Sequence, residues 1–131
     1  MKQYSFLQEN NIGSFSHSPL FYVVTYGGDE GTIPHFHIYA QDNKKKINIC
    51  IQIEDNRYFE HDKYRGTITD GKIRKQLVKF LKEKPSTFKG RNFKTNWDWI
   101  KHVWNSGNNL LKATRKDIPD YTTIKPYKES K

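Results

Sequence analysis

The sequence predicts an α+β fold, in which a small antiparallel β-sheet from the N-terminal half packs against two C-terminal α-helices. Residues 20–26 are aromatic and β-branched throughout, and isoleucine occupies every second position from 47 to 53, as is typical of strands. In the second half, apolar residues instead recur at the three- and four-residue spacing of helices. Strand and helix patterns therefore occupy separate halves of the chain.

Length and composition favour one soluble, cytoplasmic domain. The chain has 131 residues, of which 34% are hydrophobic and 15% aromatic, so we expect a core built from a few large side chains. The chain has no apolar run long enough to span a membrane, and residues 1–4 lack the apolar stretch of an export signal. The single cysteine, Cys50, excludes an internal disulfide and a cysteine-rich zinc site, which fits a reducing compartment.

The chain is expected to divide into three segments. Residues 1–19 form an irregular N-terminal lead-in, because 13–19 is rich in serine, glycine and proline. Residues 20–107 form the single α+β domain. Residues 108–131 form a basic, partly flexible tail, part of which can lie on the domain. The apolar residues available for this contact are Leu110, Leu111, Ile118, Tyr121, Ile124 and Tyr127.

Turn residues bound the predicted strands. The strand at 20–26 ends at two glycines, and Pro34, which donates no ladder hydrogen bond, opens a second strand at 35–41. A polar, lysine-rich turn then leads into a third strand at 47–54, where isoleucines alternate with other residues. Weaker strand signals follow at 57–66 and 67–69.

The apolar residues of the second and third strands predict how these strands pair. They must share one face of the sheet, because a one-residue slip would expose the whole apolar set of one strand. The expected apolar pairs are Phe36 with Ile53, Ile38 with Ile51 and Ala40 with Ile49. On the opposite face the expected pairs are His35 with Glu54, His37 with Gln52 and Tyr39 with Cys50.

Two amphipathic helices are predicted, at 71–84 and between 95 and 107. Pro85 ends the first helix and Gly107 ends the second. The expected N-caps are Thr69 or Asp70 and Thr95 or Asn96. The apolar stripes are Ile73, Leu77, Val78, Phe80 and Leu81 in the first helix and Trp97, Ile100, Val103 and Trp104 in the second.

A short motif relates the chain to a known family. Residues 33–38 read Ile-Pro-His-Phe-His-Ile before a strand, and Gly66-Thr67-Ile68 leads into a basic helix and a tryptophan-centred second helix. Over about residues 20–104 this arrangement resembles a family of small bacterial and phage proteins with a Pro-His-Phe-His signature. That family is a domain of unknown function, often encoded near toxin–antitoxin or mobile-element loci, so the resemblance implies an origin and no activity.

His35 and His37 are candidate metal ligands. Residues i and i+2 of a strand project from one face about 6.6 Å apart, so two imidazoles can converge on one ion. Glu54, expected opposite His35, completes a set of two histidines and a carboxylate that suits iron, manganese or zinc. The leading expectation is nevertheless no cofactor, because histidines on a polar sheet face are more often hydrogen-bonded or packed. A metal-free general base is also disfavoured, since no positioned nucleophile accompanies it.

Positive charge is concentrated in the second half of the chain. Residues 1–70 carry seven Lys/Arg and nine Asp/Glu (7 − 9 = −2), and residues 71–131 carry sixteen and five (16 − 5 = +11). Such a block attracts polyanions over about 8–10 Å. The lysines of 71–84 lie opposite the apolar stripe, and the connector at 86–94 continues the charge. The candidate contact residues are Lys72, Arg74, Lys75, Lys79, Lys82, Lys84, Lys89, Arg91 and Lys94, with Trp99 as an exposed aromatic residue.

These observations favour a small, basic, non-catalytic binding protein that contacts nucleic acid or a nucleoprotein. Lysines that contact phosphates supply affinity without reading sequence, and an exposed aromatic ring can stack on bases. Three alternatives stay open: a solvated basic face, an inhibitor or antitoxin that binds an acidic protein surface, and a metal-dependent hydrolase that uses His35, His37 and Glu54. A membrane partner is not expected.

Overall fold

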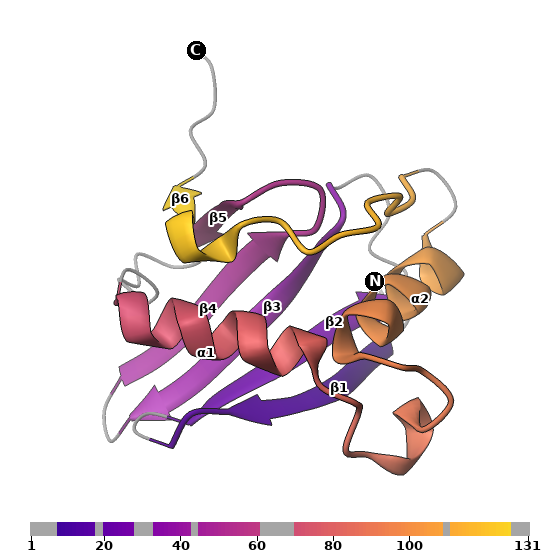
Figure 1. Ribbon diagram of the computed structural model, residues 1–131, viewed down its shortest axis with the longest axis horizontal. Helices are drawn as coiled ribbons and strands as arrows, with labels where there is room; N and C mark the ends of the chain where they lie inside the picture. Colours follow the sequence, from indigo (N-terminus) through magenta and orange to yellow (C-terminus); the bar gives the residue numbers. More distant parts are fainter. Residues whose placement is uncertain are drawn as a thin grey trace, which may run out of the picture.

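The computed structural model describes residues 8–17, 20–27, 33–42, 45–60, 70–108 and 111–126. Its strands form a six-stranded sheet in the order β1-β2-β3-β4-β5-β6, antiparallel except for the parallel pair β5 and β6 (Figure 1). The strands are β1 (Gln8–Phe15), β2 (Phe21–Gly27), β3 (His35–Asp42), β4 (Lys45–Gln52), β5 (Arg57–Glu60) and β6 (Lys125–Pro126). The helices are α1 (Gly71–Lys82) and α2 (Asn96–Gly107), with the short 3₁₀ helices η2 (Phe88–Gly90) and η3 (Tyr121–Thr123). The α+β class is confirmed.

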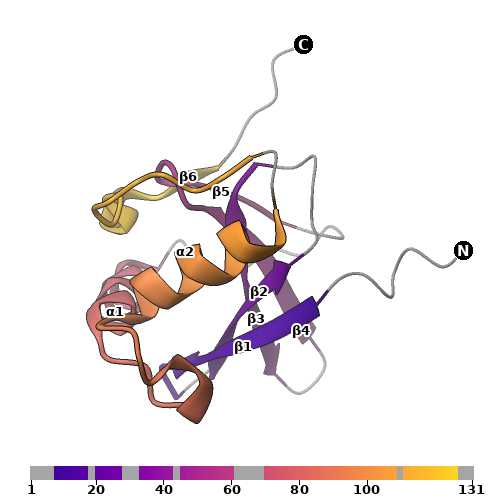
Figure 2. The same cartoon turned by 90° about the vertical axis from the view of Figure 1, so that its right-hand side faces the viewer.

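The two α-helices lie on the same side of the sheet, as the two perpendicular views show (Figures 1 and 2). Asp70 caps the N-terminus of α1, because its side chain accepts a hydrogen bond from the backbone N–H of Lys72. Thr95 caps α2 by accepting from the backbone N–H of Asp98. Both caps and both apolar stripes agree with the sequence. The stripes pack on what we call the helix-covered face of the sheet, whose buried residues include Phe21, Val23, Phe36, Ile38, Ile49 and Ile51.

The opposite face of the sheet carries both histidines of the signature motif. We call it the histidine face, and its residues are Tyr22, Val24, Tyr26, His35, His37, Tyr39, Asn48, Cys50 and Gln52. Both described α-helices lie on the other side of the sheet (Figure 2), although Trp104 of α2 approaches the ring of His35. Val24, His35, His37, Cys50 and Gln52 are nevertheless all buried.

The predicted pairing partners of β3 and β4 are wrong by two residues. Phe36 pairs with Ile51 and Ile38 with Ile49, while His35 pairs with Gln52 and His37 with Cys50. The last pair is Asp42 with Lys45, which leaves a two-residue loop. A shift of two preserves which face each side chain takes, so the apolar pattern could not distinguish the two registers. The predicted faces are correct, and only the partners change.

The predicted irregular lead-in is wrong where it overlaps β1. This strand pairs with β2 along its length, with an irregularity between Asn11 and Gly13 that interrupts the alternation of its side chains. Gly13 has a φ of +153°, and a Cβ at this position would lie 3.0 Å from the ring of Phe80. Within β1 only Ile12 and Phe15 are large apolar residues, and both are buried. Their three-residue spacing does not show the alternation of a strand.

The predicted tail also belongs to the fold over residues 111–126. Tyr121 is fully buried, and its hydroxyl donates to the backbone oxygen of Gln52 at the end of β4. The amide of Asn56 donates to the backbone oxygen of Thr123, 3.0 Å away, beside β6. Ile124 is buried, whereas Leu111 is 41% exposed. The folded domain is therefore wider than the predicted range of 20–107.

Other parts of the prediction lie outside the described residues. These include residues 1–7 and 18–19 of the predicted lead-in, the turn and strand signals within 61–69, Leu110, Tyr127 and the last residues of the tail. Within the described ranges, no helix has the length and apolar character needed to cross a membrane.

Candidate nucleic-acid interface and histidine cluster

α1 presents a row of lysines on the side away from the sheet. Ile73, Leu77, Phe80 and Leu81 are buried against the core, so the residues between them point outward. Lys72, Lys75, Lys79 and Lys82 are exposed, as predicted, and Arg74 is half-buried. Within the described ranges, no acidic side chain lies within 4.0 Å of any of these lysines.

The connector between α1 and α2, residues 83–95, is held at both ends. Asn96 donates to the backbone oxygen of Phe80 through its side chain (2.8 Å) and to that of Glu83 through its N–H (2.8 Å). The ammonium group of Lys84 donates to the backbone oxygens of Arg91 and Phe93. Lys84 therefore fastens the connector. The exposed cations that remain on it are Lys89, Arg91 and Lys94.

Phe88, in η2, is the most exposed large hydrophobic residue of the described chain, at 75%. The guanidinium carbon of Arg91 lies 3.8 Å from the centre of its ring, and Nη1 of Arg91 donates to the backbone oxygen of Phe88 (3.1 Å). Residues 71–94 carry nine cationic side chains and one carboxylate, so 9 − 1 = +8. The structure thus presents an aromatic ring and a stacked cation within a strongly positive segment.

Trp99 is not the exposed aromatic residue that the sequence predicted. It is 4% exposed and stacks on Phe93 with ring centres 6.5 Å apart. Gly90 lies so close that an added Cβ would be 2.4 Å from the Trp99 ring. The connector folds back over α2 and buries a second side of this helix, which the apolar stripe alone did not indicate. Trp97 and Trp104 are buried, as predicted.

A pocket of about 330 Å³ lies beside the connector. Lys89 and Ser106 contribute polar groups to it, and the rings of Phe93 and His102 approach within 5.0 Å, centre to centre. The pocket is lined by Asn10, Lys89, Phe93, Trp99, His102, Val103, Ser106 and Gly107. The basic residues therefore adjoin a hollow with aromatic walls.

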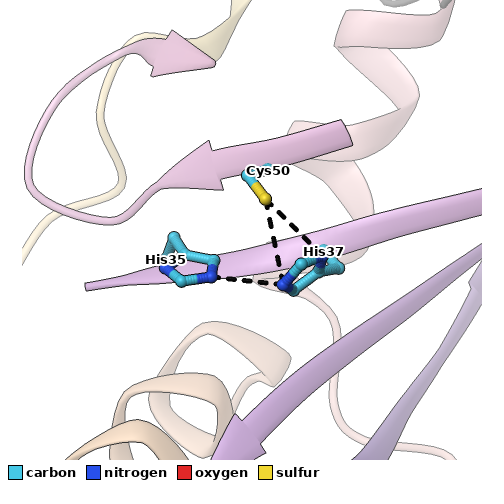
Figure 3. A group of neighbouring side chains, drawn as sticks. All are labelled: His35, His37 and Cys50. Carbon is cyan, nitrogen blue, oxygen red and sulfur yellow. Dashed lines mark hydrogen bonds between the residues drawn. The ribbon is translucent and has the colours of Figure 1, made fainter. Parts of the chain in front are cut away.

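On the histidine face, His35, His37 and Cys50 form a cluster (Figure 3). The Nε2 atoms of the two histidines are 3.2 Å apart, and Sγ of Cys50 is 3.5 Å from Nδ1 and 3.8 Å from Nε2 of His37. One potential ligand atom from each of the three residues lies within 4.8 Å of the others. Exposed fractions of 6%, 7% and 1% place all three away from bulk water.

Glu54 does not join this cluster. Its carboxylate accepts hydrogen bonds from the backbone N–H groups of Thr114 (2.6 Å) and Arg115 (3.3 Å), so it anchors the C-terminal segment. The two-residue difference in register places Gln52 opposite His35 and Cys50 opposite His37. The predicted set of two histidines and a carboxylate is thereby replaced by two histidines and a thiol.

Aromatic and amide side chains surround the cluster. His37 stacks on Tyr39 (5.7 Å, 8°) and meets the edge of Tyr26 (4.9 Å, 89°), and the two tyrosine hydroxyls are hydrogen-bonded (2.6 Å). Burial raises the pKa of Tyr39 well above its ordinary value, and the hydrogen bond to Tyr26 raises it further. These two tyrosines also line an open pocket of about 450 Å³.

The cluster also touches α2. The pairing of β2 with β3 ends at Val24 and His37, and beyond this point Trp104 of α2 approaches the ring of His35, with centres 5.0 Å apart. Of the other histidines, His17 is exposed, His102 lines the pocket beside the connector, and His61 lies outside the described residues.

Comparison with known proteins leaves the family open. The chain matches no protein-family model, no curated protein and no solved structure.

Proposed function

We propose that this protein binds single-stranded nucleic acid through a basic surface that runs along α1 and onto the connector. We define the basic surface as Lys72, Lys75, Lys79, Lys82, Phe88, Lys89, Arg91 and Lys94. The observation that carries the proposal is Phe88, 75% exposed and stacked with Arg91 inside a segment of charge +8.

The cations of this surface suit phosphates because they are available for contact. The lysines of α1 are exposed and make no ion pair within the described chain, so binding would not first require a salt bridge to break. Lysine contacts to phosphate release counterions and add affinity that falls steeply with salt. They position the strand and do not read its bases.

The exposed ring favours a single strand over a duplex. A base can stack on Phe88 only if it is not already stacked and paired in a duplex, and such stacking contributes about 1–3 kcal/mol per base. The neighbouring pocket adds a second aromatic hollow beside Lys89. The surface thereby combines a phosphate-binding track with a stacking platform.

Fluorescence anisotropy with labelled oligo(dT), oligo(U) and a duplex of equal length tests the proposal. In the variant Lys75→Glu, Lys79→Glu, Lys82→Glu, the plot of log affinity against log salt should become shallower by about 0.7 for each lost contact to a single strand. The matched control is Lys112→Glu, Lys116→Glu, Lys125→Glu, which changes net charge equally at exposed residues of the C-terminal segment. It should retain the wild-type slope.

Phe88→Ala separates stacking from charge. It should weaken binding to single strands by about 1–3 kcal/mol without changing their salt dependence. Tyr22→Ala, at a 42% exposed tyrosine on the histidine face, is the control and should bind normally. Equal losses in both charge-reversal variants, or full binding by Phe88→Ala, would contradict the proposed surface. If the protein instead binds an acidic protein, with an affinity that depends only weakly on salt, the result would favour the inhibitor alternative.

A further inference from the structure

We propose that His35, His37 and Cys50 form a binding site for a divalent zinc ion. The site lies on the histidine face and does not depend on nucleic-acid binding by the basic surface. Three arguments support it: the spacing of the ligand atoms, the hydrogen bonds that orient the rings, and the chemistry of the donor set.

The β-sheet itself brings the three side chains together. His35 and His37 are two residues apart on β3 and project from one face, while Cys50 is the cross-strand partner of His37 on β4. Figure 3 shows Cys50 pointing from β4 toward His37 on β3, with Nε2 of His35 directed at Nε2 of His37. Two ladder-bonded strands hold the ligands, so little chain entropy remains to be lost on binding.

The distances fit a tetrahedral ion. Zinc bonds of about 2.0–2.1 Å to nitrogen and about 2.3 Å to sulfur separate two nitrogens by about 3.3 Å and a nitrogen from a sulfur by about 3.6 Å. The Nε2 atoms are 3.2 Å apart, and Sγ of Cys50 is 3.8 Å from Nε2 of His37. Sub-ångström movements would complete the geometry on these two edges.

Hydrogen bonds to the outer nitrogens direct both Nε2 atoms inward. The backbone oxygen of Ile33 can only accept, so Nδ1 of His35, 2.7 Å away, carries a hydrogen. Oδ1 of Asn48 lies 3.1 Å from Nδ1 of His37 and can accept a hydrogen bond from that nitrogen in the same way. With hydrogens on both outer nitrogens, both Nε2 lone pairs can face an ion between the rings, which would replace the hydrogen bond that otherwise joins the two Nε2 atoms. Metal-bound histidines are typically oriented by such second hydrogen bonds.

The donor set selects the metal. One thiolate and two imidazoles suit zinc, whereas magnesium, calcium and manganese prefer oxygen ligands. Binding converts the thiol of Cys50 to a thiolate, so each bound ion releases one proton. Three protein ligands leave a fourth position for water or another small ligand.

Cobalt(II) provides the direct test, because its absorption spectrum reports both geometry and ligands. The complete chain, freed of metal by a chelator and shown to be folded by circular dichroism, should take up one equivalent of Co²⁺. Visible bands of tetrahedral cobalt should appear together with a near-ultraviolet charge-transfer band from the thiolate. Zinc should abolish both signals by displacement. Absence of uptake by the folded chain would overturn the proposal.

Four variants assign the ligands. Cys50→Ala should lose the near-ultraviolet band, and His35→Ala with His37→Ala should lose binding altogether. Asn48→Ala should weaken binding about 10- to 100-fold, because it removes the orienting hydrogen bond. Glu54→Gln is the matched control and should bind cobalt normally. A charge-transfer band that survives Cys50→Ala, or metal uptake abolished by Glu54→Gln in a folded chain, would contradict the assigned set.

A thiol assay on the unmodified chain tests the site without any variant, so its result does not depend on whether a variant folds. Cys50 is the only cysteine, so every reacting thiol is the proposed ligand. Stoichiometric zinc should slow its reaction with a disulfide reagent by about tenfold or more, since the thiolate becomes coordinated. Equal rates with and without zinc would reject the site.

Discussion

The two faces of the sheet are buried by different kinds of interaction, and β4 shows both. Ile49 and Ile51 are fully buried under the helices, while their neighbour Cys50 and the adjoining Gln52 are almost as buried on the histidine face. On the first face, burial removes apolar surface from water and is favourable in itself. On the second, each buried polar group needs a partner, because desolvation alone is unfavourable.

The difference shows where stability and chemistry reside in this small domain. The helix-covered face joins β1, the central strands, both helices and the C-terminal segment into one core. The histidine face contributes a compact set of polar contacts: the His35–His37 pair, the Tyr26–Tyr39 pair and the amide of Asn48. Replacing a side chain of the first face should therefore cost more stability than replacing one of the second.

The largest expected effect comes from truncating the helix-covered face. Ile51→Ala removes a fully buried side chain and should lower the free energy of unfolding by about 2–5 kcal/mol. Cys50→Ala, one residue away on the other face, should cost about 1 kcal/mol in the presence of a chelator, since far less apolar surface is lost. Urea denaturation of both variants measures the contrast. Equal losses would mean that the two faces contribute alike.

Sequence patterns predicted whatever depends on periodicity. Alternating isoleucines assigned the faces of β4, and the stripe from Ile73 to Leu81 identified the buried side of α1. Patterns failed where a local irregularity or a distant contact decides the structure. β1 was missed because its sequence is polar and irregular around Gly13, and the burial of Tyr121 depends on the end of β4, far away in the sequence.

The candidate sites show the same limit. The paired histidines and the basic helix were visible in the sequence because each lies within one element. Cys50 was missed as a neighbour of His37, since registers that differ by two residues bury the same apolar residues. Phe88 was missed in favour of Trp99, although its position among Ser86, Thr87 and Gly90 offered no helical stripe in which to bury it.

A second, smaller effect concerns the link between the C-terminal segment and β4. Tyr121→Phe leaves the backbone oxygen of Gln52 without this donor and should cost about 1–3 kcal/mol at neutral pH. Burial raises the pKa of Tyr121 well above its ordinary value, with a further contribution from the charge of Asp55. Above about pH 10 the unfolded chain therefore releases a proton that the folded chain retains, and stability falls by up to about 1.4 kcal/mol per pH unit.

The variant lacks this titrating group, so the stability difference between wild type and Tyr121→Phe should narrow as pH rises above about 10. Denaturation curves at neutral and alkaline pH measure it. The same measurement on Tyr39→Phe gives a comparison. The pKa of Tyr39 is also raised by burial, although its side chain lies on the histidine face. A constant difference across this pH range would show that the buried hydroxyl of Tyr121 is not linked to folding.

The smallest expected effect lies in the tyrosine pair of the histidine face. Tyr26 and Tyr39 are half-buried, and their hydroxyls are 2.6 Å apart, so each can satisfy the other while solvent remains close. Tyr26→Phe and Tyr39→Phe should each cost about 0.5–1.5 kcal/mol, and the double variant little more than either one, because both remove the same hydrogen bond. Urea denaturation of the four proteins gives the coupling energy directly. Single losses that simply add would show that the hydroxyls act independently, and losses as large as that of Ile51→Ala would remove the contrast between the two faces.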